Sequence, residues 1–380
     1  MPDTVAAVLR ASGTPGAPPP FDALRIERVD VAPPGPGEVR VRPVTACLCH
    51  SDLSVLSGHR VRPLPMVLGH EASGVVTDVG PGVTRVAPGD RVVMTFVPEC
   101  GACRYCREGR PALCTPGNAA NARGELLSGA RPFRDGDGAA LHQHLGLSAF
   151  SEQTVVAEQS LIRLPGDVSL ETAALFGCAV VTGVGAVVKT ARVPPGSTAA
   201  VFGLGGVGLS AVMGCRLVGC ARIVALDIDP AKLEVAKDLG ATDALIAGGD
   251  AAATVQELTG GGVDFAFDAT GVPSVLLQAY NSTRRGGTAI VVGLSDPAAE
   301  VGIKPSDLVA SERCLRGSYM GTISPARDIP WLLDLHRAGR LPVERLIGER
   351  LSLADLPAAF ERLHAGTVGR QLVSIGPATA

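Results

Sequence analysis

An apolar run that ends in a glycine-rich turn constrains the fold of this chain most strongly. The run at residues 198–202 leads into GLGGVG, which places Gly203, Gly205 and Gly208 in the spacing G-x-G-x-x-G. Between a strand and a helix, the first glycine permits a tight turn and the second lets the backbone approach a pyrophosphate. The third lets helix and strand pack closely. The pattern predicts a strand, a turn and a helix that bind a dinucleotide, although a plain strand–helix turn is the alternative for the glycines alone.

Residues downstream of the turn alternate between apolar runs and helical patterns. A polar helical pattern at 230–239 separates the first two of four further apolar runs, which lie at residues 223–226, 244–246, 263–267 and 288–292. Buried strands that alternate with helices form a parallel sheet through right-handed crossovers. The sequence therefore predicts a doubly wound parallel α/β sheet, the Rossmann arrangement.

An acidic residue after the next apolar run indicates which dinucleotide is bound. Asp227 lies 24 positions after Gly203, where a carboxylate hydrogen-bonds the adenosine ribose. No arginine adjoins Asp227, and Asp229 adds negative charge. A 2′-phosphate would be repelled, so we predict NAD rather than NADP.

The first half of the chain has a different pattern. Short β-type runs at 38–42, 74–79 and 91–96 are separated by Pro/Gly turns, which predicts a small, irregular β barrel. Residues 117–145 are polar and Gly-rich without periodicity, and a long surface loop is expected there. A length of 380 residues is sufficient for two such domains.

Charge and the N-terminal sequence bear on location and partners. The net charge is −3 with no long run of one sign, which gives no reason to expect nucleic acid or an anionic membrane. The start, MPDTVAAVLR, lacks the pattern of a secretory signal. The longest uncharged stretch, 193–215, contains two prolines and the glycine turn, so a membrane span is not expected. We expect a soluble cytoplasmic enzyme or binding protein.

Four of the ten cysteines crowd into one short segment. They have the spacing C-x2-C-x2-C-x7-C and are Cys100, Cys103, Cys106 and Cys114. Such spacing suits a closed tetrahedral thiolate zinc site, in which four protein ligands leave no position for substrate. Four reduced cysteines in a loop, or an iron–sulfur cluster, are the alternatives. The segment predicts a structural zinc site.

A second candidate metal site uses residues far apart in the sequence. Cys49, His70 and Cys178 form a Cys2His set that would leave one zinc position open, as a catalytic zinc requires. Each alone would more often be a core residue. Asp52 could accept a hydrogen bond from His70 and fix its tautomer. Glu71 could lie behind the metal or bind it transiently.

With these motifs assembled, the chain resembles the zinc-containing medium-chain alcohol dehydrogenases, closest to the longer-chain subgroup of liver-type and class III-like enzymes. The matching segments are CHSD, GHEASGVV, CGACRYC with Cys114, HLGLSAFSEQTVV, and GSTAAVFGLGGVGLSAVMGC followed by ALDID. The resemblance implies a GroES-like catalytic domain of residues 1–179 and 321–380 and a Rossmann NAD-binding domain of residues 180–320. It also implies a homodimer that oxidises a primary alcohol, aliphatic or aromatic, with one catalytic and one structural zinc.

The resemblance assigns roles residue by residue. Cys49, His70 and Cys178 match the catalytic zinc ligands, and Ser51 matches the hydroxyl that takes the alcohol proton. Phe96 matches a substrate-pocket aromatic. The positions that match cofactor contacts are His50, Thr182, Gly203, Gly205, Gly206, Val207, Gly208, Asp227, Lys232, Val292 and Arg370. A turn-capping Ser51, an exposed helix lysine at 232 and plain core positions for Phe96 and Thr182 are the alternatives.

The chain also departs from the family pattern. Ser54 stands where liver-type enzymes often carry the histidine that ends the proton relay, so the proton is expected to leave through water or His50. His59, Arg60 and Arg62 stand near positions where thiol-adduct relatives carry acidic residues. These cations argue against oxidation of glutathione adducts and suggest a different or anionic substrate.

Three rival interpretations belong to the same superfamily. A dehydrogenase of thiol–formaldehyde adducts is disfavoured by Arg60 and Arg62. A non-catalytic dinucleotide-binding relative would have lost a catalytic ligand, and a zinc-free quinone reductase would lack both cysteine sets; this chain has all of them. His142 and His144 are expected to be loop residues near the catalytic domain.

Overall fold

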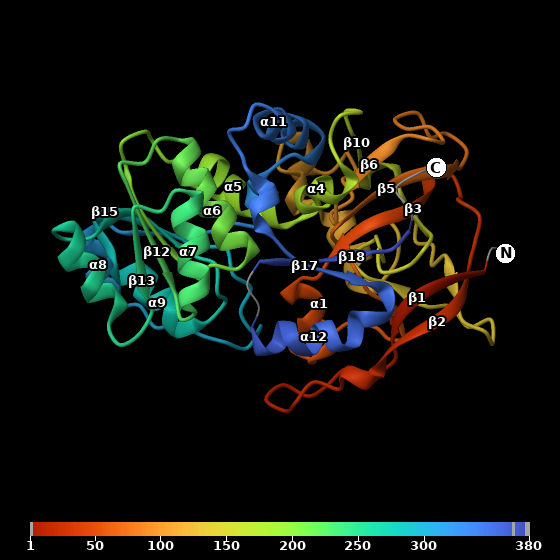
Figure 1. Cartoon of the computed structure of the whole chain (residues 1–380), viewed down its shortest axis with the longest axis horizontal. Coiled ribbons are helices and arrows are strands. Elements are labelled where there is room, and N and C mark those ends of the chain that lie inside the picture. Colours follow the sequence, from red (N-terminus) through yellow and green to blue (C-terminus); the bar gives the residue numbers. More distant parts are fainter. Residues whose placement is uncertain (1–2, 367–368, 377–380) are drawn as a thin grey trace. The chain divides into compact units, whose positions relative to one another are not determined.

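The computed structural model describes residues 3–366 and 369–376 (Figure 1). Its contacts divide the chain into two compact units. The first contains Met1–Cys178, Ser324–Asp334 and Ile347–Ala380, and the second contains Ala179–Ile323 and Leu335–Leu346. The sequence prediction places 321–380 wholly in the catalytic domain, whereas Leu335–Leu346 lies in the second unit, where η7 (Val343–Leu346) packs against α6 (Gly206–Leu217). The outer limits of the predicted domains, residues 1 and 380, lie outside the described residues.

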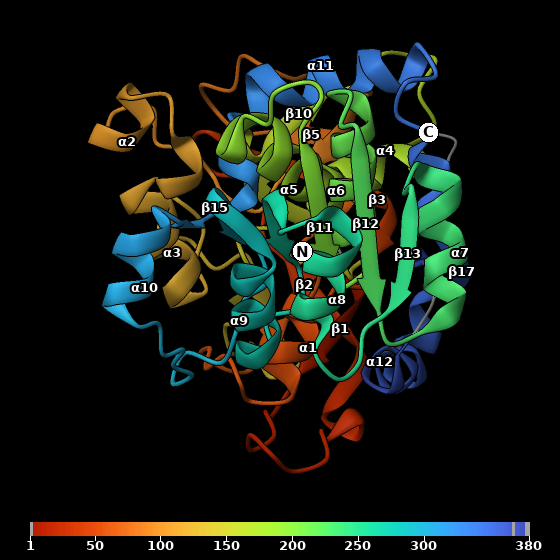
Figure 2. The ribbon, with the colours of Figure 1, turned by 90° about the vertical axis from the view of Figure 1, so that its left-hand side faces the viewer.

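The second unit is built on one parallel sheet of six strands, in the order β13-β12-β11-β14-β15-β16. Figure 2 shows β11, β12 and β13 side by side. The strands are β11 (Thr198–Phe202), β12 (Arg222–Asp227), β13 (Asp243–Ile246), β14 (Val263–Asp268), β15 (Thr283–Val291) and β16 (Cys314–Gly317). The order, with the first strand central and later strands extending to either side, is that of a dinucleotide-binding sheet. The predicted Rossmann arrangement is confirmed.

Helices alternate with the strands of the second unit after β11, and two further helical segments, α5 and η5, precede that strand. The helical segments are α5 (Ala179–Gly185), η5 (Ala186–Ala191), α6, α7 (Pro230–Leu239), α8 (Ala251–Thr259), α9 (Pro273–Asn281) and α10 (Pro305–Ser311). Asp229 caps α7 by accepting a hydrogen bond from the Ala231 amide at 2.9 Å, and Gly240 ends that helix with a φ of 118°. The core of this unit lies under the sheet, where buried Phe202, Leu226 and Val255 pack together.

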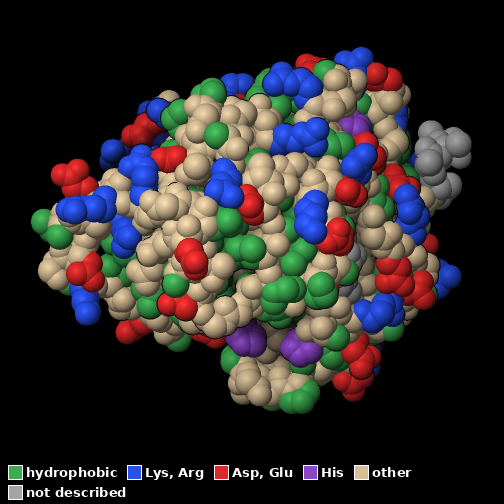
Figure 3. Space-filling model, turned by 60° about the vertical axis from the view of Figure 1, so that its left-hand side comes forward, with side chains coloured by type: hydrophobic (Ala, Val, Ile, Leu, Met, Phe, Trp, Pro, Cys, Tyr) green, Lys and Arg blue, Asp and Glu red, His purple; other side chains and the backbone are tan. Residues whose placement is uncertain are grey.

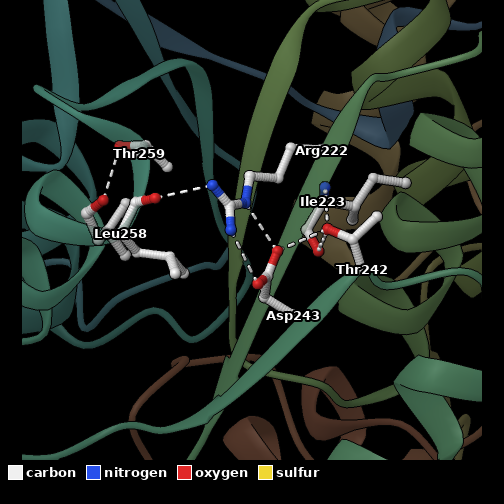
Figure 4. Close-up of polar contacts among 7 residues, drawn as sticks. Arg222, Ile223, Thr242, Asp243, Leu258 and Thr259 are labelled. Carbon is white, nitrogen blue, oxygen red and sulfur yellow. Dashed lines mark hydrogen bonds and ion pairs between the residues drawn. The ribbon is translucent and has the colours of Figure 1, made fainter.

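A polar cluster links two strands of this sheet to a helix (Figure 4). The Arg222 guanidinium contacts both carboxylate oxygens of Asp243, with Nε–Oδ2 at 2.8 Å and Nη2–Oδ1 at 3.1 Å. Its Nη1 donates to the Leu258 carbonyl at the end of α8, at 2.7 Å. The Thr242 hydroxyl donates to Asp243 at 2.7 Å. The hydrogen bond from Arg222 is the main cause that lowers the pKa of Asp243.

Asp243→Asn should lower the free energy of unfolding at pH 7 by about 1 kcal/mol, because it removes one charge from a partly exposed bidentate pair. The folded-state pKa of Asp243 is depressed, so its contribution is present above the unfolded-state pKa of about 4 and is lost as pH falls through the folded-state value. Urea denaturation of both proteins should therefore show a difference at pH 7 that shrinks toward pH 3. An equal difference at both pH values would contradict this electrostatic origin.

The first unit holds two β-sheets, where a small irregular barrel is predicted. One sheet has the order β7-β2-β1-β4-β8, and the other β10-β6-β5-β3-β18-β17 with β9 also pairing β3. The strands are β1 (Asp3–Leu9), β2 (Leu24–Val31), β3 (Glu38–Cys47), β4 (Met66–Val67), β5 (Ala72–Val79), β6 (Arg91–Met94), β7 (Phe133–Arg134), β8 (His142–Gln143), β9 (Thr154–Ala157), β10 (Leu161–Arg163), β17 (Ile347–Ser352) and β18 (Arg370–Ser374). The three β-type runs of the sequence lie in β3, β5 and β6.

Short helices connect these strands. They are η1 (Phe21–Ala23), α1 (His50–Leu56), α2 (Arg104–Arg107), η2 (Pro111–Leu113), α3 (Thr115–Arg123), η3 (Glu158–Ser160), α4 (Leu170–Ala174), η4 (Leu175–Gly177), η8 (Leu353–Asp355) and α12 (Leu356–Ala365). Helix α11 (Pro325–Arg337) begins in the first unit and ends in the second, and η6 (Met320–Thr322) precedes it. Strand β18 pairs antiparallel with β3, with Leu372 opposite Cys47, and so returns the C-terminal segment to the first unit.

The segment at 117–145 is not the surface loop expected from its composition. It contains most of α3 and the short strands β7 and β8, and all of its large apolar residues except Leu127 are buried. Leu126, Phe133 and Leu141 share one core cluster with Val29 and Val67. These apolar residues are too widely spaced to produce a periodic signal, yet the tertiary fold brings each of them into the same core.

Within the described residues no single helix is long and apolar enough to cross a membrane, and the pair Leu170–Gly177 and Ala179–Ala191 passes that test only when taken together. The uncharged stretch at 193–215 forms β11, the glycine turn and most of α6. On the face shown in Figure 3, acidic and basic side chains are interspersed, as a net charge of −3 without long charge runs suggests.

Candidate metal centres and dinucleotide site

Cys49, His70 and Cys178 come together in the first unit. Their potential ligand atoms all lie within 4.8 Å of one another, and all three residues are buried. Cys49 precedes α1, His70 follows β4, and Cys178 follows η4. Among the described residues, neither buried ring nitrogen of His70 makes a hydrogen bond of regular geometry; Nδ1 lies 2.9 Å from Asp52, so Nε2 is the nitrogen left to bind a metal. Two sulfurs and one imidazole nitrogen suit zinc and leave a fourth position open.

The backbone conformation at Gly69 and a contact with Asp52 orient the His70 side chain toward Cys49 and Cys178. Gly69 has a φ of 95°, and a Cβ there would lie 2.4 Å from the Phe150 amide nitrogen, so only glycine fits. The Gly69 amide donates to Oδ1 of Asp52 at 3.0 Å. Nδ1 of His70 lies 2.9 Å from Oδ2 of Asp52, a hydrogen-bonding distance. The predicted partnership of Asp52 with His70 is therefore present, and it directs Nε2 toward the two cysteines.

Electrostatics favour a thiolate at Cys49, whereas the hydrogen bond with Cys49 and burial raise the pKa of Cys178 well above its usual value. Cys178 lowers the pKa of Cys49 well below its usual value, although burial opposes the shift. Burial alone would lower the pKa of His70, but the charges of Asp52 and Cys49 raise it. Burial would likewise raise the pKa of Asp52, yet the histidines beside it hold that pKa well below its usual range. The Cys49 thiolate is the form of that side chain that binds a divalent cation, and His70 would bind one as a neutral imidazole after losing a proton.

The buried carboxylate of Glu71 has a buried cationic partner. This carboxylate forms an ion pair with Arg370, which β18 supplies through its pairing with β3. A buried charge requires such a partner. The role predicted for Arg370 at a cofactor pyrophosphate, and that of Glu71 at the metal, stay predictions.

Phe96 flanks the candidate metal ligand. Its ring meets that of His70 edge to face, with centroids 5.6 Å apart, and is buried. The Asn121 side-chain amide donates to the Phe96 carbonyl at 2.8 Å and anchors that segment. Ser51 and His50 lie in the first turn of α1, next to Cys49, and the hydroxyl of Ser54 donates to the His50 carbonyl at 2.7 Å. Ser51, His50 and Phe96 thus lie close in sequence or in space to the three candidate ligands.

The four clustered cysteines form a second group, with all potential ligand atoms within 4.8 Å. Backbone amides point at the sulfurs: that of Cys103 donates to Cys100 Sγ and that of Cys100 donates to Cys114 Sγ, both at 3.3 Å. The backbone amide of Cys106 is the main cause that lowers the pKa of Cys103 to about 6. Four convergent sulfurs with amide donors fit a structural zinc ion, as the spacing predicts.

The glycine turn of the second unit has the geometry that its spacing predicts. Gly203 has a φ of 85°, and a Cβ on Gly208 would lie 1.7 Å from the Gly203 carbonyl oxygen. A Cβ on Gly205 would meet no atom within 4 Å, so this residue faces open space. The first and third glycines are therefore required by the fold, and the second leaves room for a ligand to approach the backbone.

Asp227 holds the turn from the next strand. Its Oδ2 accepts a hydrogen bond from the Leu204 amide at 2.6 Å, and its Oδ1 accepts one from the Asp229 amide at 3.0 Å. The ammonium of Lys232 lies 3.9 Å from Oδ1. Of the other predicted cofactor contacts in this unit, Gly206 and Val207 begin α6, Thr182 lies in α5 and Val292 directly follows β15.

Sequence reasoning missed His144. The expected loop residue is buried, and its Nδ1 lies 2.9 Å from Oδ1 of Asp52. No spacing pattern links His144 to Asp52, so the only available signal was its histidine identity in a segment that resembles the family.

Comparison with known proteins identifies the family. Residues 35–166 match the alcohol dehydrogenase GroES-like domain and residues 206–337 match the zinc-binding dehydrogenase family. An S-(hydroxymethyl)glutathione dehydrogenase of Synechocystis is 38% identical over 92% of this chain and 96% of its own length. The chain belongs to the zinc-containing medium-chain alcohol dehydrogenases. Both parts of the expected fold, GroES-like and Rossmann, are confirmed.

Two further relatives of this dehydrogenase extend the comparison. An alcohol dehydrogenase class-3 of Myxine glutinosa is 36% identical over 93% of this chain and 94% of its own length. The crystal structure of benzyl alcohol dehydrogenase from Acinetobacter calcoaceticus is similar with a TM-score of 0.91 and 30% identity, covering 99% of this chain and 100% of that chain. The predicted class III-like, zinc-dependent alcohol dehydrogenase class is confirmed, with alcohols and aldehydes as its small-molecule partners.

Proposed function

We propose that this dehydrogenase reversibly oxidises a primary alcohol, aliphatic or aromatic, to the aldehyde with NAD as hydride acceptor. The observation that carries the proposal is the convergence of Cys49, His70 and Cys178 into a buried set of three ligands with an open fourth position. The similarity to benzyl alcohol dehydrogenase supports an alcohol substrate that can be aromatic.

The residues around this set suggest how the chain contributes to the reaction. Zinc held by Cys49, His70 and Cys178 would lower the pKa of a substrate hydroxyl, as it lowers that of water from about 16 to about 7. Asp52 orients His70 for this task through the 2.9 Å contact. Ser51 would accept the proton of the alcohol, and the Phe96 ring would exclude water from one side of the site. With Ser54 bonded to its own helix backbone, the proton would leave through water or His50.

Asp227 supports NAD over NADP. Its buried carboxylate ends β12 beside the glycine turn, where a ribose 2′-hydroxyl could donate to it and a 2′-phosphate would be repelled. Lys232 is 3.9 Å away and partly balances the charge.

One observation favours a second candidate function. The relative with 38% identity is named for S-(hydroxymethyl)glutathione, a thiol adduct of formaldehyde. His59, Arg60 and Arg62 argue against this substrate, because the thiol-adduct relatives that the chain resembles carry acidic residues there.

The decisive experiment is NADH formation with primary, secondary and aromatic alcohols and with S-(hydroxymethyl)glutathione, before and after zinc removal. Zinc-dependent turnover of a primary alcohol supports the proposal. Exclusive turnover of the glutathione adduct supports the second candidate. No turnover with any substrate, with zinc and NAD both bound, favours a non-catalytic relative.

We further propose a homodimer that forms at the β16 edge of the sheet. Within the described residues β16 pairs only with β15, and all four of its residues are exposed. Exposed apolar side chains adjoin this edge, with Leu315 40% and Val309 77% exposed. An open strand edge with apolar neighbours is suited to pairing with a second copy. Light scattering should give twice the chain mass, and Leu315→Asp should give a monomer.

We also propose a cytoplasmic location. All ten cysteines are free, and both candidate metal sites require reduced thiols, which the cytosol maintains. Cell fractionation would test this location.

A further inference from the structure

We propose that His144 is a positioning residue for the catalytic zinc site, because it shares the carboxylate of Asp52 with His70. The inference rests on the proposed function, since it assigns a role to a residue behind the Cys49, His70 and Cys178 set. It adds to that set a side chain that would not touch the metal.

The carboxylate of Asp52 is held on both of its oxygens. Oδ2 lies 2.9 Å from Nδ1 of His70, while Oδ1 lies 2.9 Å from Nδ1 of His144 and accepts the Gly69 amide at 3.0 Å. All three side chains of this group are at most 2% exposed. With both oxygens engaged, the carboxylate cannot rotate without breaking at least one buried contact.

His144 is itself rigidly held. It follows β8, which runs parallel to β4 with Val67 opposite Gln143. The His144 amide donates to the Val67 carbonyl at 3.2 Å and to the Ser148 hydroxyl at 3.0 Å. The Ser148 hydroxyl donates in turn to the Val67 carbonyl at 2.8 Å. The strand pair that precedes His70 therefore also positions His144.

The imidazole rings of His70 and His144 also pack against each other. The His144 and His70 rings meet edge to face at 85°, with centroids 5.4 Å apart. Asp52, His70 and His144 could be considered a metal site of their own, since their ligand atoms cluster. The Nδ1 atoms of both histidines instead lie 2.9 Å from the two carboxylate oxygens, so Asp52 is the shared ion-pair partner of both rings.

The position of the Asp52 carboxylate determines the orientation of the His70 ring. When Asp52 accepts from Nδ1 of His70, that nitrogen carries the proton and Nε2 is free to bind metal. Without His144, Oδ1 would retain only the Gly69 amide, and the carboxylate could turn away from His70. Groups that orient metal-bound histidines typically change metal affinity by about 10- to 100-fold when they are removed.

Two variants distinguish the effect of the contact between His144 Nδ1 and Asp52 from the effect of the size of the His144 side chain. His144→Phe keeps an aromatic ring against His70 but removes the donor at Nδ1. His144→Asn is the matched rescue, because its amide nitrogen can occupy the place of Nδ1. The zinc dissociation constant is measured by chelator competition, and the visible spectrum of cobalt-substituted protein reports ligand geometry at the catalytic site. The four-cysteine site provides an internal control in both measurements.

We expect His144→Phe to weaken zinc binding at the catalytic site by about 10- to 100-fold and to shift the cobalt spectrum. His144→Asn should stay near the wild type. Unchanged affinity and spectrum in His144→Phe would overturn the inference. If His144→Phe does not fold, His144→Asn is compared with His144→Gln, whose amide is one bond farther from the backbone; equal zinc affinity in that pair would also overturn it. A wild-type chain that binds one zinc ion instead of two would contradict the proposed function itself.

Discussion

His70→Ala should reduce zinc-dependent alcohol oxidation by at least about 1,000-fold, equivalent to about 4 kcal/mol of transition-state stabilisation. The substitution removes one of three buried ligands, and two cysteines alone are too few to hold a catalytic zinc ion, which needs three protein ligands. The Asp52 carboxylate keeps its contact with His144, so the first unit should still fold.

Binding of NAD should survive this substitution. The glycine turn and Asp227 lie in the second unit and make none of their described hydrogen bonds to His70. Zinc content should fall from two ions per chain to one, NADH formation should disappear, and the NAD dissociation constant from fluorescence titration should change little.

His142→Ala is the matched control. This nearby histidine contacts the Arg123 carbonyl through Nδ1 at 3.1 Å and belongs to neither candidate metal site. We expect it to retain two zinc ions and nearly normal turnover. Turnover within a few-fold of the wild type in His70→Ala would refute the assignment of His70 as a ligand.

Of two alanine substitutions in the glycine turn, only Gly208→Ala should destabilise the fold, whereas both should weaken NAD binding. In Gly208→Ala the new Cβ would lie 1.7 Å from the Gly203 carbonyl oxygen, so the backbone must shift. Overpacking of this severity should cost about 3 kcal/mol or more and should also remove NAD binding. In Gly205→Ala the new Cβ meets no atom within 4 Å, and stability should be unchanged.

Gly205→Ala should nevertheless weaken NAD binding by about 10- to 100-fold, because its methyl group would occupy the space through which the pyrophosphate approaches the backbone. Urea denaturation and NAD titration of both variants measure the two effects separately. Gly136→Ala, in the first unit and also facing open space, is the control. Wild-type NAD affinity in Gly205→Ala would place the pyrophosphate elsewhere.

Much of the second unit and the four-cysteine site could be predicted from local sequence. The run at 198–202 and the helical pattern at 230–239 coincide with β11 and α7, because apolar spacing and caps act over a few residues. The four cysteines converge because all of them lie within fifteen residues. The catalytic set was predicted through family resemblance, since no spacing rule connects Cys49, His70 and Cys178.

Local sequence was thus sufficient to predict the parallel sheet, the glycine turn and the type of metal chemistry. The side chains that surround the catalytic set became apparent from the tertiary structure. Arg370 reaches Glu71 through the pairing of β18 with β3, and His144 reaches Asp52 through the pairing of β4 with β8. Long-range strand pairing depends on how all the buried surfaces fit together, and neighbours in sequence carry little information about it.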